Sequence, residues 1–192
     1  MAYSSWLEKL KSRIFIKNSE IIEVSQHEQA ITNAEDKKPI LATYGLAPCI
    51  SFSGWSPRHR IGFMTHYDSK TELESSFEIL LKNISEQLHW QSTEFETRII
   101  GGYNYNNNSQ ETINFIKSKL NARPNITMKL VEERIFTREV ESVLLDTITG
   151  YVGVYNPKKP VEINEDFFKE LINNLNSLKT PARLIYVPGG MK

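Results

Sequence analysis

The chain has 192 residues, 40% hydrophobic and 24% charged, and this composition fits a single globular domain with a sizeable core. Lysine plus arginine and aspartate plus glutamate both number 23, so there is no basic excess to neutralise phosphates and no nucleic-acid partner is expected. The longest apolar runs fall far below the roughly 18 residues of a membrane span, so no membrane partner is expected either.

The N-terminal residues MAYSSWLEKLKSRIFIKNSE carry charges every few positions and contain no apolar segment typical of a signal peptide. One cysteine excludes an intramolecular disulfide framework and fits a reducing compartment, so a cytoplasmic location is expected, with signal-independent export left open. The four histidines lie far apart, without Cys-x-x-Cys or His-x-x-x-His spacing, so neither a metal site nor a cofactor is expected.

In chain order, the sequence predicts one domain over 1–192, with residues 1–38 as an N-terminal arm and 188–192 as a flexible tail. Short apolar segments that contain β-branched or aromatic residues predict strands. Apolar residues at helical spacing predict helices, the clearest at 71–88 with Ser69 as its cap, and a second capped by Ser109 or Asn108. A third helix is predicted at 165–178. The predicted strands are 40–44, 49–53, 61–66, 95–100, 126–131, 140–146, 151–155 and 183–187.

Because these strands come mostly in neighbouring runs with few interposed helices, the pattern predicts an α+β fold with a largely antiparallel sheet. Two of the strands carry the residues of chemical interest. If Phe52 pairs with Ile61 across a hairpin, Cys49 faces Met64 and His66 lies diagonally beyond it on the same side of the sheet. The chain's one cysteine and an imidazole are therefore expected close together.

A thiol becomes a good nucleophile when a neighbouring imidazole takes its proton, and the base needs a third group to fix its ring. The Thr43 hydroxyl or backbone carbonyl is the first candidate for that third group, and Asp68 is the second. Attack on a carbonyl also needs donors for the oxyanion, and the backbone N–H of Cys49 is the first choice because Pro48 has none. The alternative is that Cys49 is only a small buried hydrophobic residue.

Thr43, Cys49 and His66, spaced by six and then 17 residues, resemble the Thr/Cys/His set of the CheD chemoreceptor glutamine deamidase family. The segment Thr65-His66-Tyr67-Asp68 is similar to the Thr-His-x-Asp segment of the protein N-terminal asparagine amidohydrolases. The resemblance covers about residues 40–120 and implies a layered β-sandwich flanked by helices. The Gly-rich, Arg-containing segment of the receptor deamidases is replaced here by residues 131–134, so the resemblance implies the chemistry and does not identify the substrate.

The resemblance implies a cysteine amidohydrolase that deamidates Gln or Asn in a protein or peptide, N-terminal Asn included, with catalytic residues Cys49, His66 and Thr43. Gly101 and Gly102 are predicted to shape a substrate rim, and Trp55 on the hairpin loop to touch a polypeptide. Three alternatives stay open: an inactive protein-binding module on the same fold, a transglutaminase if an amine replaces water, and a peptidase. The sequence leaves the oligomeric state open.

Overall fold

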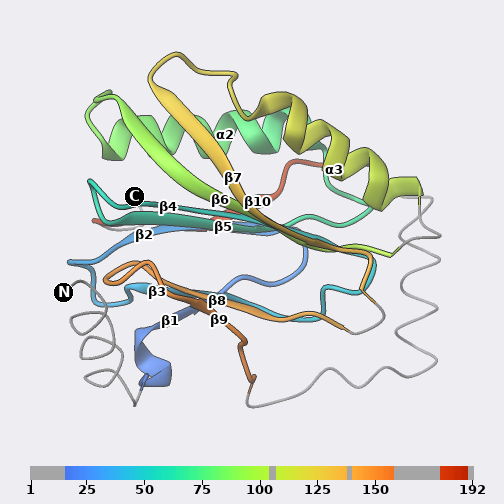
Figure 1. The fold of residues 1–192 in the computed structure, drawn as a ribbon, viewed down its shortest axis with the longest axis horizontal. Coiled ribbons are helices and arrows are strands. Elements are labelled where there is room, and N and C mark those ends of the chain that lie inside the picture. The colour runs from blue at the N-terminus through green and yellow to red at the C-terminus, as the bar shows by residue number, and fades with distance from the viewer. Residues whose placement is uncertain (1–15, 104–106, 138–139, 158–177, 190–192) are drawn as a thin grey trace.

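The computed structural model of the chain describes residues 16–103, 107–137, 140–157 and 178–189. These residues form an α+β fold in three layers: two helices, a six-stranded sheet beneath them and a four-stranded sheet on the far side (Figure 1). Five of the eight strand pairings in the described residues are antiparallel and three are parallel. The prediction of an α+β protein with largely antiparallel strands is confirmed, although both sheets are mixed.

The six-stranded sheet has the strand order β10-β2-β5-β4-β6-β7. Its two edge pairings, β10 with β2 and β6 with β7, are parallel, and the central three are antiparallel. The strands are β2 (Glu28–Asn33), β4 (Ile50–Ser56), β5 (Ile61–His66), β6 (Thr93–Gly101), β7 (Ile126–Ile135) and β10 (Arg183–Tyr186).

The four-stranded sheet has the order β1-β3-β8-β9, with β1 and β3 parallel and the other pairs antiparallel. Its strands are β1 (Ile21–Glu23), β3 (Ile40–Thr43), β8 (Val143–Asp146) and β9 (Val152–Gly153), and a short 3-10 helix η1 (Asn18–Glu20) precedes β1. All four residues of β3 and of β8 are buried.

The helices α2 (Leu73–Gln87) and α3 (Asn107–Lys119) cover one face of the six-stranded sheet. Aromatic rings fill this interface: Phe52 lies 5.1 Å from Phe63 and 5.8 Å from Phe77, measured between ring centroids. The other face of the sheet packs on the four-stranded sheet through a second apolar core, which includes Leu41, Met64 and Ile100. Cys49 belongs to this second core.

Helix α2 confirms the helix predicted at 71–88, but its cap is not Ser69. The Glu72 carboxylate accepts hydrogen bonds from the N–H groups of Glu74 and Ser75, and Glu72 is the N-cap residue. Helix α3 begins at Asn107, so Ser109 lies inside its first turn, and its hydroxyl donates to the carbonyl of Pro48 at 2.8 Å. The helix predicted at 165–178 lies outside the described residues except for its last position.

The prediction that residues 1–38 form an arm is wrong for the part of this range that contains β1 and β2. Strand β2 lies inside the six-stranded sheet and is covered on both faces, with four consecutive residues buried. Because Gln29 and Thr32 are among those buried residues, β2 has neither the polar–apolar alternation nor the continuous apolar run that marks a strand in sequence. Residues 1–15 lie outside the described ranges.

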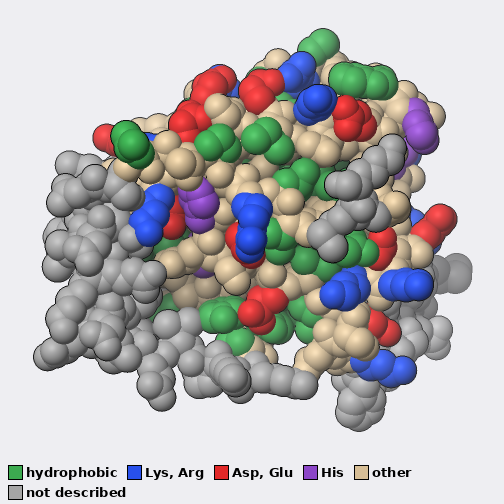
Figure 2. Space-filling view, turned by 180° about the vertical axis from the view of Figure 1, so that it is seen from behind, with side chains coloured by type: hydrophobic (Ala, Val, Ile, Leu, Met, Phe, Trp, Pro, Cys, Tyr) green, Lys and Arg blue, Asp and Glu red, His purple; other side chains and the backbone are tan. Residues whose placement is uncertain are grey.

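The surface carries both signs of charge. On the face shown in Figure 2, lysine and arginine side chains are interspersed with aspartate and glutamate in the part that is not grey. No helix among the described residues is long and apolar enough to cross a membrane.

Candidate active site

Strands β4 and β5 bring Cys49 and His66 to the same face of the sheet, but through a different register from the one predicted. Ile61 pairs with Ser56 instead of Phe52, and Ser53 pairs with Met64. The displacement is four residues along β4, an even number, so each side chain keeps its predicted face. An isolated bridge pairs Ile50 with Tyr67, so the residues before them in sequence, Cys49 and His66, share the opposite face, between the two sheets.

Thr43, at the end of β3 in the facing sheet, holds the imidazole of His66. The Thr43 hydroxyl donates to the Val24 carbonyl at 2.7 Å, and its oxygen lies 2.8 Å from Nδ1 of His66. A hydroxyl has one proton, and here the carbonyl takes it, so Thr43 accepts from Nδ1–H. This fixes the tautomer of neutral His66 with a free lone pair on Nε2, the nitrogen that a general base uses. Among the candidate orienting groups, the geometry favours the Thr43 hydroxyl.

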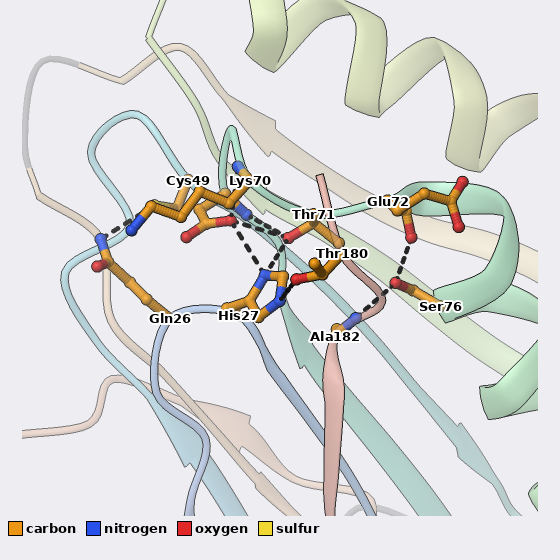
Figure 3. Close-up of polar contacts among 10 residues, drawn as sticks. Gln26, His27, Cys49, Lys70, Thr71, Glu72, Ser76, Thr180 and Ala182 are labelled. Atoms are coloured by element: carbon orange, nitrogen blue, oxygen red, sulfur yellow. Dashed lines mark hydrogen bonds and ion pairs between the residues drawn. The ribbon is translucent and has the colours of Figure 1, made fainter. Parts of the chain in front are cut away.

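Asp68, the second candidate for orienting His66, is occupied elsewhere. Its carboxylate accepts from the Thr71 hydroxyl at 2.9 Å and from the Lys70 N–H at 3.0 Å, and it lies 3.5 Å from Nδ1 of His27. Figure 3 labels the three partners of this carboxylate, His27, Lys70 and Thr71. Asp68 therefore acts on His66 through its charge and not through a hydrogen bond to the ring.

Cys49 is buried, with 2% of its surface exposed, and its thiol is the neutral form at physiological pH. Burial and the nearby charge of Asp68 raise the pKa of the thiol from 9.0 to about 12, and a hydrogen bond from Gln26 lowers the pKa in part. The Gln26 side chain donates from Nε2 to Sγ over 3.5 Å (Figure 3). Since Gln26 is itself exposed, the sulfur lies just below the surface.

His66 is also 2% exposed, and burial lowers the pKa of its imidazole from 6.5 to about 4, although the charges of Asp68 and Glu28 act to raise it. With the thiol pKa raised and the imidazole pKa lowered, the resting pair is a thiol and a neutral imidazole. Both pKa shifts act against a thiolate–imidazolium pair, in which the imidazole has taken the proton of the thiol. A neutral imidazole is the form that accepts a proton, so this state suits general-base activation of the thiol at the moment of attack.

Six buried side-chain polar atoms have no hydrogen-bond partner among the described residues, and two of them, Nε2 of His66 and Oγ of Ser51, come from β4 and β5 on the face that carries Cys49. Continuing the Ile50–Tyr67 pairing by one residue places Ser51 across from His66. Buried polar atoms are almost always satisfied, so two orphans facing the same layer are a costly feature in an otherwise apolar core. They can serve a polar group that enters the site, such as a carboxamide or a water molecule.

Gly101 and Gly102 shape the chain around Cys49 and do not form a rim. Both are buried, and the N–H of Gly102 donates to the Cys49 carbonyl at 2.9 Å. Gly101 has φ +106°, and a Cβ there would lie 2.4 Å from the Cys49 carbonyl oxygen. Only glycine tolerates both the backbone conformation and the approach. Their burial does not support the predicted contact with substrate; both glycines shape the backbone around Cys49.

Trp55 does not lie with the other predicted site residues. It is on β4 and not on a loop, because the strand continues to Ser56, and its indole N–H donates to the Thr147 carbonyl at 2.9 Å. Its ring also packs against Gly150, where a Cβ would come within 2.4 Å of the indole. Six residues of extended chain separate it from Cys49, about 20 Å. The substrate contact predicted for Trp55 has no support in this position.

Sequence reasoning missed Gln26 and its neighbours. Val24, Gln26 and His27 form the turn between β1 and β2, within the range predicted to be an arm. The His27 N–H donates to the His66 carbonyl at 2.9 Å, and the His27 ring lies between the Thr71 and Thr180 hydroxyls, at 3.3 and 2.9 Å. No motif marks these residues. Only the crossing of β1 and β2 into different sheets brings their turn to Cys49.

A cavity of about 330 Å³ lies away from Cys49, near the opposite end of the six-stranded sheet. It is lined by the end of β2, the β4–β5 turn and the end of α2, with Arg58, His59 and Arg60 among its residues. None of the predicted site residues lines it. In the described part of the chain, no group of three or more His, Cys, Asp or Glu side chains is arranged to hold a metal ion.

No protein-family model matches the chain, and no curated protein matches it.

Proposed function

We propose that the protein is a cysteine amidohydrolase that converts the side-chain carboxamide of Gln or Asn in a protein or peptide, N-terminal Asn included, to a carboxylate. The observation that supports this most is the Thr43–His66 hydrogen bond, which leaves Nε2 of a buried imidazole unpaired on the face that carries Cys49. Buried polar atoms usually have a partner. Nε2 of His59 is also unpaired among the described residues, but His59 lies away from Cys49. It is therefore the position of His66 beside Cys49 and Thr43 that supports the proposal.

In the proposed reaction, Nε2 of His66 takes the thiol proton of Cys49 as Sγ attacks the carboxamide carbon. A C–S bond forms, and the carbonyl electron pair moves onto oxygen. When the intermediate collapses, the C–N bond breaks and His66 delivers its proton to the departing nitrogen, which leaves as ammonia. Water, deprotonated by His66, then attacks the thioester carbon. The C–S bond breaks, the carboxyl product leaves, and the thiol regains its proton.

The assignment to a CheD-like deamidase fold is part of the same proposal. It rests on the Thr43, Cys49 and His66 spacing together with the arrangement that these residues adopt, one from each of three segments around the space between two sheets. An amine in place of water at the thioester step would make the enzyme a transglutaminase, since both reactions share the acylation step.

The second candidate, an inactive protein-binding module on the same fold, is favoured by one observation. Cys49 is 2% exposed with a thiol pKa of about 12, whereas most reactive cysteines are partly exposed with a lowered pKa. Under this candidate Cys49 is a small buried hydrophobic residue.

Ammonia release separates the two candidates. The purified protein is incubated with unfolded casein, which exposes many Gln and Asn side chains, and with a peptide that begins with Asn. We expect ammonia and a matching conversion of carboxamide to carboxylate by mass spectrometry, absent in Cys49→Ala and in His66→Ala and retained in the remote variant Trp55→Phe. Equal ammonia release by wild type and Cys49→Ala contradicts the enzyme, and cleaved backbone bonds indicate a peptidase.

The pH dependence of alkylation tests the proposed resting state. Because the thiol pKa is raised to about 12, the rate of iodoacetamide reaction at Cys49 is expected to rise steadily with pH from 7 to beyond 10. An ordinary cysteine levels off above its pKa of about 8.5. A plateau below pH 7, lost in His66→Ala, would show instead that the protein rests as the thiolate–imidazolium pair.

A further inference from the structure

The sulfur of Cys49 has a polar partner that no part of the proposed reaction has used. Nε2 of Gln26 donates to Sγ over 3.5 Å, and this is the side-chain contact that lies between the buried sulfur and the exposed surface of the turn (Figure 3). The tetrahedral oxyanion of acyl transfer is two covalent bonds from the attacking sulfur. A donor hydrogen-bonded to Sγ at rest is therefore close to the region where the oxyanion forms, and an oxyanion needs donors at about 3 Å.

The turn that carries Gln26 is held by the same residues that organise the site. On one side, the carbonyl of Val24 accepts the Thr43 hydroxyl at 2.7 Å. On the other side, the N–H of His27 donates to the His66 carbonyl at 2.9 Å. His27 has φ 63°, a backbone conformation that non-glycine residues rarely adopt, and its ring is fixed between two threonine hydroxyls. Gln26 is thus presented to the sulfur from a turn anchored to Thr43 and His66.

A second donor is present at the nucleophile itself. The N–H of Cys49 donates no backbone hydrogen bond among the described residues, although the adjacent carbonyl is taken by Gly102. Oxyanion sites commonly combine the backbone N–H of the nucleophile with a donor from another segment. Here the second segment is the β1–β2 turn.

We propose that Gln26 is a catalytic residue that donates its side-chain N–H to the oxyanion formed on attack by Cys49, together with the Cys49 N–H. This inference deepens the proposed function, since it assigns a role in acyl transfer at the same site. It gives a chemical reason for an exposed glutamine to keep its amide on a buried sulfur. At rest the same hydrogen bond lowers the cost of charging the thiol as the proton leaves.

The test compares two reactions of Cys49, one that develops an oxyanion and one that does not. Acylation by p-nitrophenyl acetate passes through a tetrahedral oxyanion, whereas alkylation by iodoacetamide is a displacement at carbon. Both rates are measured at the same pH in the full-length protein, so the cost of deprotonating the thiol cancels in their ratio. Gln26→Ala removes the amide, and Gln26→Met removes the donor while keeping the length of the side chain.

The ratio of acylation to alkylation is expected to fall about 100-fold in both Gln26 variants, the effect of losing one oxyanion donor. Ser25→Ala, in the same exposed turn, is the matched control and should leave the ratio unchanged. An unchanged ratio in the Gln26 variants, with both rates rising or falling together, shows that Gln26 is only a cover over the sulfur and overturns the inference. The inference is also overturned if neither p-nitrophenyl acetate nor iodoacetamide modifies Cys49 in the wild-type protein.

The outcome is distinguishable from failure of the proposed function. Wild type could release no ammonia from casein or the Asn peptide while the ratio of acylation to alkylation still falls in the Gln26 variants. The amidohydrolase proposal is then wrong, and Gln26 remains an oxyanion donor for a different acyl substrate. If ammonia release depends on Cys49 but is unchanged in Gln26→Ala, the enzyme stands and the role of Gln26 does not.

Discussion

The two faces of the six-stranded sheet are equally buried but are built in opposite ways. The face under α2 and α3 is filled with rings, among them Phe52, Phe63 and Phe77, which are at most 1% exposed and contact one another at 5.1 to 5.8 Å. The face toward the four-stranded sheet contains Thr43, Cys49 and His66 within an otherwise apolar core, and Nε2 of His66 and Oγ of Ser51 have no partner among the described residues.

This difference separates stability from chemistry within one sheet. Apolar burial contributes stability in proportion to area, whereas an unpaired buried donor or acceptor costs about 1–3 kcal/mol. Oγ1 of Thr97, on the ring-filled face, also has no partner among the described residues. The division thus rests on the grouping of Thr43, Cys49 and His66 and not on unpaired atoms alone. The ring-filled face is therefore expected to hold the protein together, and the polar face to carry its chemistry.

The largest effect on stability is expected on the ring-filled face. Phe77→Ala removes a side chain that is 1% exposed and stacks on Phe52, so we expect a loss of about 3–5 kcal/mol from the free energy of unfolding in urea. Cys49→Ala, on the polar face, should cost about 1 kcal/mol or less while abolishing ammonia release. Similar losses for the two variants would contradict the division between the faces.

The next effect is the pH dependence that His66 imposes. Its pKa is lowered from 6.5 in the unfolded chain to about 4 in the fold, so between these values the unfolded state binds more protons and stability rises with pH. The contribution of neutral His66 to the free energy of unfolding is complete above pH 6.5 and is lost as the pH falls toward 4. Between pH 8 and 4.5 the loss is about 2–3 kcal/mol.

This contribution is measured by comparing urea unfolding of wild type and His66→Gln at both pH values. Because glutamine does not titrate, His66→Gln should lose less unfolding free energy than wild type between pH 8 and pH 4.5, and the difference should equal the loss due to His66. If both proteins lose the same stability on acidification, the ring of His66 is not a buried neutral imidazole.

A smaller loss of stability is expected from Thr43→Val, which keeps the shape of the side chain and removes its hydroxyl. The Val24 carbonyl and Nδ1–H of His66 both lose the Thr43 hydroxyl as a partner, at a cost of about 2 kcal/mol. Ammonia release should fall because His66 is no longer held in one tautomer. Thr43→Ser keeps the hydroxyl and should retain most of the activity, and equal activity of the Val and Ser variants would remove Thr43 from the mechanism.

The smallest effect is expected at Ser51, and it is informative for that reason. Since Oγ of Ser51 has no partner among the described residues, Ser51→Ala should change the free energy of unfolding by less than about 0.5 kcal/mol or raise it. Ser56 on the same strand is the matched control: its hydroxyl lies 2.8 Å from that of Thr93, and Ser56→Ala should cost about 1 kcal/mol. A larger loss at Ser51 would show that its hydroxyl is already hydrogen-bonded in the resting protein.

Much of the local structure could be predicted from the sequence. The helical spacing in 71–88 predicts α2, and the apolar segments at 40–44 and 61–66 predict β3 and β5, because local periodicity reflects which face is buried. The predicted register of β4 with β5 is wrong, since the sequence predicts a strand that ends at residue 53, whereas β4 continues to Ser56. The error was an even number of residues, so the shared face of Cys49 and His66 did not depend on it.

By itself, the sequence determined that Cys49 and His66 point to one side of a sheet, because side chains alternate along every strand whatever its partners are. It also determined the spacing that places Thr43 as the candidate third group. Only the tertiary structure decided that the pair is buried and uncharged, that Thr43 approaches from a second sheet, and that Gln26 touches the sulfur. These depend on how distant segments pack and exclude water, which no local pattern records.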